Sequence, residues 1–481
     1  MAELVVGVDS STQSTKVEAR DVHTGKLVAV GRAAHPPVTP PSSEQDPTAW
    51  WRALTEAIGQ LGEHRANVVA LSVAGQQHGL VVTNALGDVL RPAKLWNDTT
   101  SADVADELVN RMGAAWWVQQ CGSVPGAAFT VTKLAWLAAH EPNTFARAQH
   151  VMLPHDYITW RLTGAHVTDR GDASGTGWWS PSGYAADVLA LVNVSADTLP
   201  RVLAPTEAAG LIESTSAAQL GVPSRVVIGP GTGDNMAAAL GLGLRVGDLA
   251  MSIGTSGTVY AVADRPTTDT SGAVAGFADA TGRYLPLVCT MNATRVTGAV
   301  AQWLGTDPAG LAQLALAAPV TAGPVLVPYF DGERTPNLPH AAGMMTGLRT
   351  TTTREEIALA AHDGVVCGLL DGLDALSAAG VVTDGILHLV GGGARSAAYR
   401  QRLAELAARP VLVPDADETV ATGAALQAAV VYYGGISGGS FTQVAAAWGL
   451  GRGTAVHPRD DVDASAIRAA YAQAARSART V

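Results

Sequence analysis

The sequence predicts an α/β protein made of two related halves that face each other across a cleft. A strand–turn–strand unit at residues 5–19 returns at residues 250–262, about half the chain away. Short apolar strands alternate with amphipathic helices between and after these two units, as is typical of α/β proteins. The 481 residues are 47% hydrophobic and 15% charged, which is enough for two or three domains with substantial cores.

The composition of the chain limits which binding partners and which cellular compartment are expected. The formal net charge of −11 argues against a nucleic-acid or anionic-membrane partner, which would require a basic face. Three cysteines (Cys121, Cys289 and Cys367) lack metal-ligand spacing and fit a reducing compartment. No stretch has the length and apolarity of a membrane span, and the N-terminus enters a strand without a signal-like segment. We therefore expect a cytoplasmic protein.

The first repeated unit combines a possible anion site with a carboxylate. Residues 5–10 form an apolar strand, and the alternating residues 16–19 return as a second strand. Ser11 and Thr12 lie in the turn, where backbone N–H groups and hydroxyls can converge on an anion. Asp9 ends the first strand and could hold a cation beside that anion. The pattern suggests Mg–nucleotide binding, and the alternative is an ordinary hairpin with an Asp–Ser turn.

The second unit makes the nucleotide hypothesis stronger. Aligning Asp9 with Ser252 places the two copies 243 positions apart. Gly254 and Thr255 then occupy the second phosphate turn, whereas Ser252 replaces the metal-side carboxylate. A phosphate hairpin in each half would hold a nucleotide from both sides. Residues near 243 to 249 mark the expected boundary, which gives an N-terminal domain of residues 1–243 and a C-terminal domain of residues 244–481.

The remaining elements of the first half follow from apolar spacing and from turn residues. Asp46 caps a helix that begins at Pro47. A buried strand follows and delivers a polar segment to its carboxyl end. The expected order is a third strand at 27–31, the helix from 47, the strand at 68–73, strands at 80–83 and 86–90 that continue the sheet, with 95–98 closing it, helices over 102–137 interrupted at 121–128, a helix from 151 to about 164, a Gly-rich loop at 169–180, a strand at 226–228, and a helix from about 235 to 242.

The second half continues with the same alternation. A triple glycine after a strand is its most distinctive feature, at residues 391–393. The expected order is the hairpin at 250–262, a long helical stretch at 293–316, a strand at 325–328, a long helix at 354–380, a strand at 386–390, a helix to 408, a strand at 411–414, an Ala-rich helix at 421–431, and a surface helix at 464–475.

Several motifs in this order resemble those of the FGGY family of carbohydrate kinases. They are Gly-Gln-Gln-His-Gly at 75–79, Leu-Trp-Asn-Asp at 95–98, Leu-Pro-His-Asp-Tyr at 153–157, Gly-Thr-Gly-Asp-Asn at 231–235 and Gly-Glu-Arg-Thr-Pro at 332–336, with residues 132–136 and 343–364 resembling the two signature segments. The resemblance covers essentially the whole chain. It implies two actin-like (ribonuclease H-like) domains, ATP and Mg²⁺ as cofactors, and phosphoryl transfer to a sugar hydroxyl. Within the family it points to D-xylulose as the sugar, and it allows a homodimer.

The resemblance also assigns roles at the sugar. It implies that Asp234 accepts the proton of the attacking hydroxyl, whereas a simple helix cap is the alternative for an Asp before a helix. It places the sugar between Asp234 and the pair Gln77 and His78, although a lone His beside glycine can also be purely structural. Further sugar contacts are expected from Asn235, Trp96, Asn97 and Asp98, with Trp96 either a wall of the site or part of the core.

At the nucleotide, Asp9 is expected to hold Mg²⁺ through waters, as this ion prefers. The expected phosphate donors are Ser11, Thr12, Gly254 and Thr255. Adenine and ribose are expected at Gly391, Gly392, Gly393 and Ala394, because glycines let the backbone approach a flat ring closely. No Gly-x4-Gly-Lys-Ser/Thr is present, which argues against a P-loop kinase. Lys16 is not assigned, because a strand residue at this position can face solvent.

Three departures from the family pattern bear on the sugar preference. Ser11 replaces a glycine, Gln77 stands where a methionine is usual, and Thr99 and Thr100 replace an arginine. Alternatives of the same chemistry are kinases of ribulose, gluconate, glycerol or a deoxy-sugar. An alternative of another class is an actin-like ATPase or binding protein with no phosphoacceptor. That class predicts a peptide-binding domain or polymer surface, and the sequence offers neither.

Overall fold

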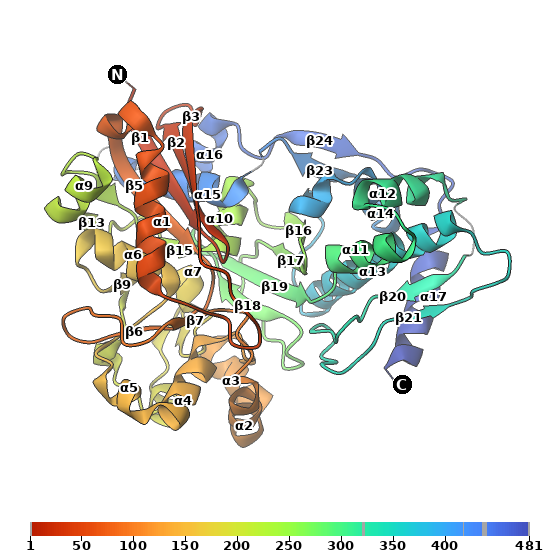
Figure 1. Ribbon diagram of the computed structural model, residues 1–481, viewed down its shortest axis with the longest axis horizontal. Coiled ribbons are helices and arrows are strands. Elements are labelled where there is room, and N and C mark those ends of the chain that lie inside the picture. The colour runs from red at the N-terminus through yellow and green to blue at the C-terminus, as the bar shows by residue number, and fades with distance from the viewer. Residues whose placement is uncertain (1, 320–322, 417, 435–439, 480–481) are drawn as a thin grey trace.

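The protein consists of two lobes, each built around a seven-stranded sheet (Figure 1). The computed structural model describes residues 2–319, 323–416, 418–434 and 440–479. Helices cover both sheets, and the apolar side chains of strands and helices form the buried cores. The predicted α/β class with two halves is confirmed.

The first sheet has a mixed order with its hairpin on one side and parallel strands on the other. Strand β1 pairs with β2 in the antiparallel sense and with β5 in the parallel sense. In spatial order the strands are β13 (Gly210–Leu211), β14 (Val227–Ile228), β5 (Val68–Gly75), β1 (Leu4–Ser10), β2 (Ser14–Asp21) and β3 (Leu27–Ala34), with β15 (Thr232–Gly233) also on β5. All seven residues of β1 are buried, because helices cover both faces of this strand.

The second sheet repeats this arrangement. Strand β16 forms a hairpin with β17 and a parallel pair with β22, as β1 does with β2 and β5. In spatial order the strands are β18 (Ala275–Ala278), β19 (Tyr284–Thr290), β17 (Gly257–Ala261), β16 (Leu249–Ile253), β22 (Leu387–Val390), β23 (Val411–Pro414) and β24 (Gly453–Val456). Asp9 and Ser252 both belong to the second-last pair of their hairpins, so the sequence alignment of the two turns is correct.

Helices and small ladders surround the sheets. In the first half the helices are α1 (Pro47–Gly59), α2 (Ala102–Met112), α3 (Ala114–Cys121), α4 (Thr130–His140), α5 (Pro142–Arg147), α6 (Pro154–Thr163), α7 (Arg170–Ala173), α8 (Ala186–Leu191), α9 (Ser214–Leu220) and α10 (Asp234–Gly241). In the second half they are α11 (Thr294–Trp303), α12 (Pro308–Ala317), α13 (Arg354–Ala378), α14 (Ala397–Leu406), α15 (Thr419–Gly434), α16 (Phe441–Trp448) and α17 (Ala464–Ala478). The two-stranded ladders are β4 (Glu44–Gln45) with β7 (Ala93–Lys94), β6 (Val81–Thr83) with β8 (His150–Met152), β9 (Val167–Thr168) with β12 (Arg201–Val202), β10 (Trp179–Ser180) with β11 (Gly183–Tyr184), and β20 (Val325–Val327) with β21 (Met344–Thr346).

Helix α15 returns from the second half of the chain and packs on the first sheet. It lies against β1 and β5 and crosses α10 (Figure 1). Glycines make this crossing close: a Cβ on Gly423 would lie 1.8 Å from the carbonyl oxygen of Ala237, and one on Gly241 would lie 1.9 Å from that of Thr419. Chain order and packing therefore differ here, because a segment beyond residue 243 completes the core of the first lobe.

Several expected elements are wrong in detail. The helix expected from 151 begins at Pro154, because residues 150–152 form β8, and β6 within the expected strands at 80–90 pairs with β8 and not with the seven-stranded sheet. Residues 169–180 are not simply a loop: they contain the short helix α7, capped by Asp169, and strand β10. The stretch 293–316 is two helices, α11 and α12, separated by a turn at Gly305 with φ of 62°. Residues 95–98 form a turn after β7 and not a strand of the sheet. In the described ranges, none of the helices combines the length and the apolarity that a bilayer-spanning helix requires.

Candidate active site

Three strand ends bring the predicted sugar and metal residues to one edge of the first sheet. Both β1 and β15 run parallel to β5, and Asp9 and Thr232 lie opposite the same residue, Ala74. Neighbouring strands are about 4.8 Å apart. The segments that follow these strands therefore meet at the carboxyl edge, where ligands bind in open α/β sheets. Asp9, the pair Gln77 and His78, and Asp234 come from these three ends.

Asp234 is the first residue of α10 and is half-buried. Its Oδ1 accepts hydrogen bonds from the main-chain N–H of Asn235 (2.8 Å) and from Asn235 Nδ2 (2.9 Å). Gly233, not Asp234, occupies the N-cap position. Burial, together with the charges of Asp9 and Asp172, raises the pKa of Asp234 to about 7. A carboxyl group with such a pKa is suited to accept a proton near neutral pH.

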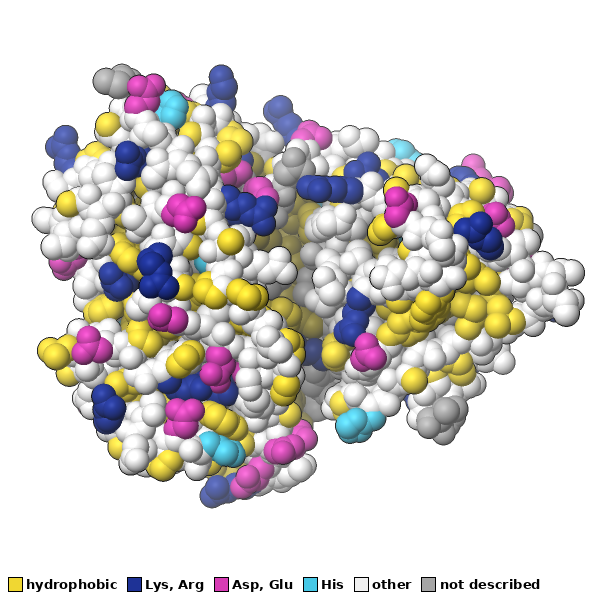
Figure 2. All heavy atoms as spheres, in the orientation of Figure 1, with side chains coloured by type: hydrophobic (Ala, Val, Ile, Leu, Met, Phe, Trp, Pro, Cys, Tyr) yellow, Lys and Arg dark blue, Asp and Glu magenta, His cyan; other side chains and the backbone are white. Residues whose placement is uncertain are grey.

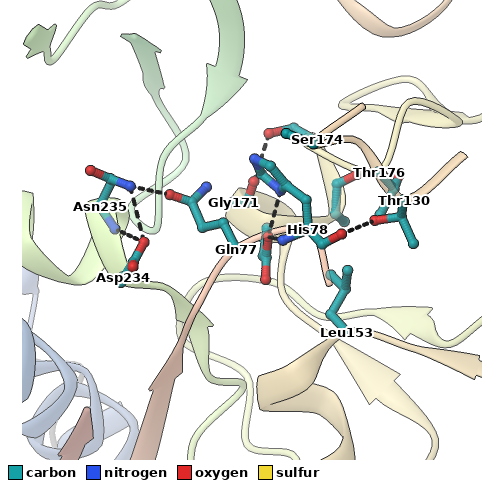
Figure 3. A network of polar contacts seen from close by, with 12 residues as sticks. Gln77, His78, Thr130, Leu153, Gly171, Ser174, Thr176, Asp234 and Asn235 are labelled. Carbon is teal, nitrogen blue, oxygen red and sulfur yellow. Dashed lines mark hydrogen bonds and ion pairs between the residues drawn. The ribbon is translucent and has the colours of Figure 1, made fainter. Parts of the chain in front are cut away.

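Gln77 joins the loop after β5 to the start of α10. Asn235 Nδ2 donates to Gln77 Oε1 at 2.5 Å, so the two amides form one surface beside Asp234 (Figure 3). Gln77 Nε2 is buried and has no hydrogen-bond partner within the described residues. An amide donor without a partner is available to an oxygen of a ligand.

His78 is held rigidly on the other side of this loop. Its backbone is left-handed, with φ of 60°, and its ring packs against Phe129 and Phe277, whose centroids lie 5.7 and 4.9 Å away. The main-chain N–H (3.1 Å) and Nδ1 (2.9 Å) both contact Asp172 Oδ1. Phe277 comes from β18 of the second sheet, so both halves enclose this histidine.

Asp172 is a site residue that the sequence reading missed, because α7 was read as loop. Asp169 is the N-cap of α7, and its side chain accepts from the N–H groups of Gly171 and Asp172. An Asp at this position is a helix-start signal, and it could have predicted α7 and with it Asp172. His155 lies in the motif at 153–157, for which the sequence predicts no separate role. The structure places it fully buried, within 3.5 Å of the carboxylates of Asp156, Asp169 and Asp172.

Asp9 lies at the bottom of the first phosphate turn and is 3% exposed. Burial raises its pKa to about 6 although Lys16 opposes the shift. Its Oδ2 is 3.5 Å from Lys16 Nζ, which also donates to Glu418 at 2.8 Å. Lys16 therefore faces inward and links the two halves. The sequence left the orientation of Lys16 open, and the structure directs it toward Asp9 and Glu418.

The donor set at Asp9 fits a hydrated magnesium ion. Asp9 Oδ1 is buried and has no hydrogen-bond partner among the described residues. The described part of the chain holds no group of three or more His, Cys, Asp or Glu side chains that could cage a metal. A single carboxylate oxygen with water in the other positions is a usual environment of Mg²⁺ in phosphate sites.

The hydroxyl groups of the first turn form hydrogen bonds within the protein. Ser11 Oγ donates to the carbonyl of Ser14 (3.3 Å), and Thr12 Oγ1 donates to Gln76 Oε1 (3.1 Å) and accepts from Trp96 Nε1 (3.0 Å). Trp96 is 38% exposed, which favours a wall of the site over core packing. The turn is thus tied to Gln76 and Trp96, next to the sugar residues.

The other two residues of the 95–98 turn differ in exposure. Asn97 is half-buried with an unpartnered Oδ1, within the described ranges. Asp98 is fully buried, and its Oδ1 accepts from Lys94 (3.3 Å) and from the main-chain N–H of Thr100 (3.1 Å). These internal contacts let Asp98 hold the turn, whereas its Oδ2 has no hydrogen-bond partner among the described residues, so the expected sugar contact stays a prediction.

The second sheet presents the predicted nucleotide residues at its own carboxyl edge. Gly254 N–H donates to the Ser256 carbonyl (2.9 Å) in the turn after β16, and Thr255 is exposed. The loop of Gly391, Gly392, Gly393 and Ala394 follows β22, the parallel neighbour of β16. A Cβ on Gly393 would lie 2.3 Å from Ile253 Cγ2, whereas one on Gly392 would meet nothing within 4 Å. The loop therefore packs on the phosphate turn and leaves Gly392 open.

The surface is hollowed along the line where the two lobes meet (Figure 2). The carboxyl ends of β1, β5 and β15 and of β16 and β22 carry all the predicted site residues except those of the 95–98 turn. The two repeated hairpins with the predicted phosphate turns, β1–β2 and β16–β17, thus belong to different lobes, and a groove separates these lobes.

Comparison with known proteins identifies the family. The family model for the N-terminal domain of FGGY carbohydrate kinases matches residues 4–241, and the model for the C-terminal domain matches residues 249–432. The chain belongs to the FGGY family of carbohydrate kinases. Among curated relatives of this FGGY kinase, a xylulose kinase of Streptomyces coelicolor is 47% identical over 98% of this chain and 96% of its own. The xylulose kinase of Escherichia coli is 35% identical over 84% of each chain.

Solved structures agree with the fold of the FGGY kinase. The crystal structure of xylulose kinase from Bifidobacterium adolescentis aligns with a TM-score of 0.86 at 40% identity, over 98% of this chain and 99% of its own. A gluconate kinase from Lactobacillus acidophilus aligns with a TM-score of 0.92 at 22% identity, which shows the shared fold alone. The actin-like fold implied by the sequence resemblance is confirmed.

Proposed function

We propose that this FGGY kinase phosphorylates D-xylulose with ATP and produces D-xylulose 5-phosphate and ADP. The names of its relatives support the sugar, since xylulose kinases from Streptomyces and Haemophilus are 35–48% identical over most of the chain. The observation that carries the reaction class is the position of Asp234, beside the Gln77–His78 loop and across strand β5 from the metal-side Asp9, with its pKa near neutrality.

The proposed step is an in-line displacement at phosphorus. The O5 hydroxyl of the sugar attacks the γ-phosphorus of ATP, the bond from that phosphorus to the β,γ-bridging oxygen breaks, and ADP leaves with the bond electrons. Asp234 accepts the proton of the hydroxyl through its carboxylate. Magnesium, when bound, would be held at Asp9 through waters and would neutralise charge on the phosphates.

The sugar would be recognised by complementary donors and acceptors. Gln77 Nε2 offers a donor, and His78, whose Nδ1 is directed at Asp172, offers Nε2 as an acceptor in the neutral tautomer. Asn235 aligns Gln77 and Asp234 relative to each other. Trp96 would cover one side of the sugar, and the half-buried Asn97 lies in the same turn.

The nucleotide would lie across the groove. The turns at 11–12 and 254–255 would contact the phosphates through main-chain N–H groups, since the hydroxyls of Ser11 and Thr12 have internal partners. Gly391, Gly392, Gly393 and Ala394 would line the adenosine site, where the open face of Gly392 lets a flat ring approach. The domains would be residues 1–243 and 244–481, with α15 bridging them.

The test is a substrate panel with coupled detection of ADP. D-xylulose, D-ribulose, D-gluconate and glycerol are each supplied with Mg–ATP, and ³¹P NMR identifies the product. The expected result is the highest kcat/KM for D-xylulose and a 5-phosphate product. A higher kcat/KM for another acceptor would reassign the sugar, and ADP release that no acceptor stimulates would refute the kinase proposal. We also place the enzyme in the cytoplasm, in line with its three unpaired thiols, whereas a homodimer stays a prediction.

A further inference from the structure

His155 is a fully buried histidine of α6 to which no role in ligand binding has been assigned. Its Nε2 lies 3.3 Å from Asp156 Oδ1, 3.3 Å from Asp169 Oδ1 and 3.5 Å from Asp172 Oδ2. These carboxylates come from α6 itself and from the start of α7, and no Lys or Arg pairs with any of them in the described residues. One imidazole thus faces three carboxylates that are also buried.

The charge state of His155 follows from this environment. Burial alone would lower the pKa of the ring, but Asp156, Asp169 and Asp172 together raise it to about 9. The imidazolium is therefore the cation that balances the cluster at neutral pH. Buried carboxylates without such a cation would take up protons, because isolated charge is costly in the interior.

Two hydrogen-bond chains lead from this cluster to the site. Asp172 Oδ1 accepts from the main-chain N–H and from Nδ1 of His78, which it holds in the left-handed conformation. Asp169 Oδ2 accepts from Thr232 Oγ1 at 2.8 Å, two residues before Asp234. The cluster thus reaches both the sugar-facing histidine and the strand that carries the base.

We propose that His155 is a positioning residue for sugar binding: its ring holds the carboxylate of Asp172 through Oδ2, and Oδ1 of the same carboxylate fixes the ring, tautomer and backbone of His78. Both lone-pair directions of Asp172 Oδ1 are used by the two donors of His78, so a displaced carboxylate would release both contacts. With Nδ1–H committed to Asp172, Nε2 of His78 is fixed as an acceptor for a sugar hydroxyl. The proposal rests on the assigned sugar site and adds residues that do not touch the substrate.

The first test is spectroscopic and needs no turnover. In ¹⁵N-histidine-labelled protein, two-bond ¹H–¹⁵N spectra distinguish the protonation state of each of the twelve histidines. At pH 8 we expect one doubly protonated ring, which His155→Gln removes, and an Nδ1–H neutral tautomer for His78, assigned with His78→Gln. A neutral His155 at pH 8, or an Nε2–H tautomer for His78, would overturn the proposal in the wild-type protein, even where a variant fails to fold.

The second test separates binding from chemistry. His155→Gln and Asp172→Asn are expected to raise KM for D-xylulose about tenfold, with a smaller change in KM for ATP. His155→Gln is also expected to shift the His78 resonances away from the Nδ1–H tautomer. The matched control is His166→Gln, which replaces a half-buried histidine in the same lobe that contacts His150 and not the acid cluster.

The outcomes distinguish this inference from the assigned function. A folded His155→Gln variant with unchanged KM and an unchanged His78 tautomer would refute the positioning role while the kinase assignment stands. Absence of sugar phosphorylation by the wild-type enzyme would refute the assigned function, whereas the histidine spectra would still test the cluster.

Discussion

Asp9 and Asp234 lie on opposite sides of strand β5, and the charge of Asp9 is, after burial, the largest cause that raises the pKa of Asp234. The charge of Asp9 thus acts on Asp234 although 225 residues separate them in the chain. Their proximity is what the two-lobed site requires, since one is assigned to the metal and the other to the proton.

Asp234→Asn is expected to lower kcat by about 10³-fold or more, because the variant loses the carboxylate that accepts the proton. Binding of D-xylulose, measured by calorimetry, should change little. In the wild-type enzyme the carboxylate form must be present, so kcat/KM should fall as the pH drops below about 7, the pKa of Asp234. Near-normal turnover of the Asn variant would remove Asp234 from its role.

Asp234→Asn should also raise the Tm of the protein, and more so at alkaline pH. The pKa of Asp234 is raised from 3.8 to about 7 on folding, so the folded state binds the proton more tightly than the unfolded state. Stability therefore falls as the pH rises from about 4 to about 7 and changes no further above that. Asp234→Asn removes this penalty, and its gain in Tm should be larger at pH 8 than at pH 5. An equal gain at both values would show that ionisation of Asp234 is not the cause.

Asp9→Asn should weaken the dependence on magnesium. The variant loses the charged oxygen that is free to order metal-bound water, so the Mg²⁺ concentration for half-maximal rate should rise about tenfold. Because Asp9 raises the pKa of Asp234, the acid limb of the pH–rate profile should also move to lower pH. The control is Asp21→Asn, which replaces a carboxylate at the end of the β1–β2 hairpin that is far from the turn. Unchanged magnesium dependence in Asp9→Asn would exclude Asp9 from the metal site.

The sequence could predict those site residues that are marked by their neighbours in the chain, and not those that are marked only by contacts with distant segments. Asp9, Asp234 and the glycines at 391–393 end strands, and a strand end can be read from the local pattern. Asp172 and His155 matter through contacts between segments that no local pattern joins, and Lys16 turns inward because Glu418, 402 positions away, binds it. The return of α15 to the first lobe was missed for the same reason. Local structure was largely predictable, whereas partners across the fold were not.

Gly175→Ala should impair sugar binding by displacing a side chain. A Cβ there would lie 1.7 Å from Cε1 of His78, and the ring cannot move away freely because Phe129 and Phe277 pack against it. We expect KM for D-xylulose to rise about tenfold, with little change in KM for ATP. Gly126→Ala is the matched control, because its Cβ would meet nothing within 4 Å. If both variants keep the wild-type KM, His78 does not contact the sugar.

The crossing of α10 and α15 sets the position of Asp234, and a pair of glycine variants tests this. On Gly423 a methyl group would lie 1.8 Å from the carbonyl oxygen of Ala237, so the helices must separate. Gly423→Ala should lower the free energy of unfolding by about 1–3 kcal/mol. In Gly298→Ala, inside α11, the methyl group meets nothing, and helix propensity should raise it by about 0.4–1 kcal/mol. Because α10 begins at Asp234, kcat should fall in Gly423→Ala at a temperature where both variants are folded, and stay unchanged in Gly298→Ala. A destabilised Gly423→Ala variant with wild-type kcat would show that the crossing supports the fold without positioning the base.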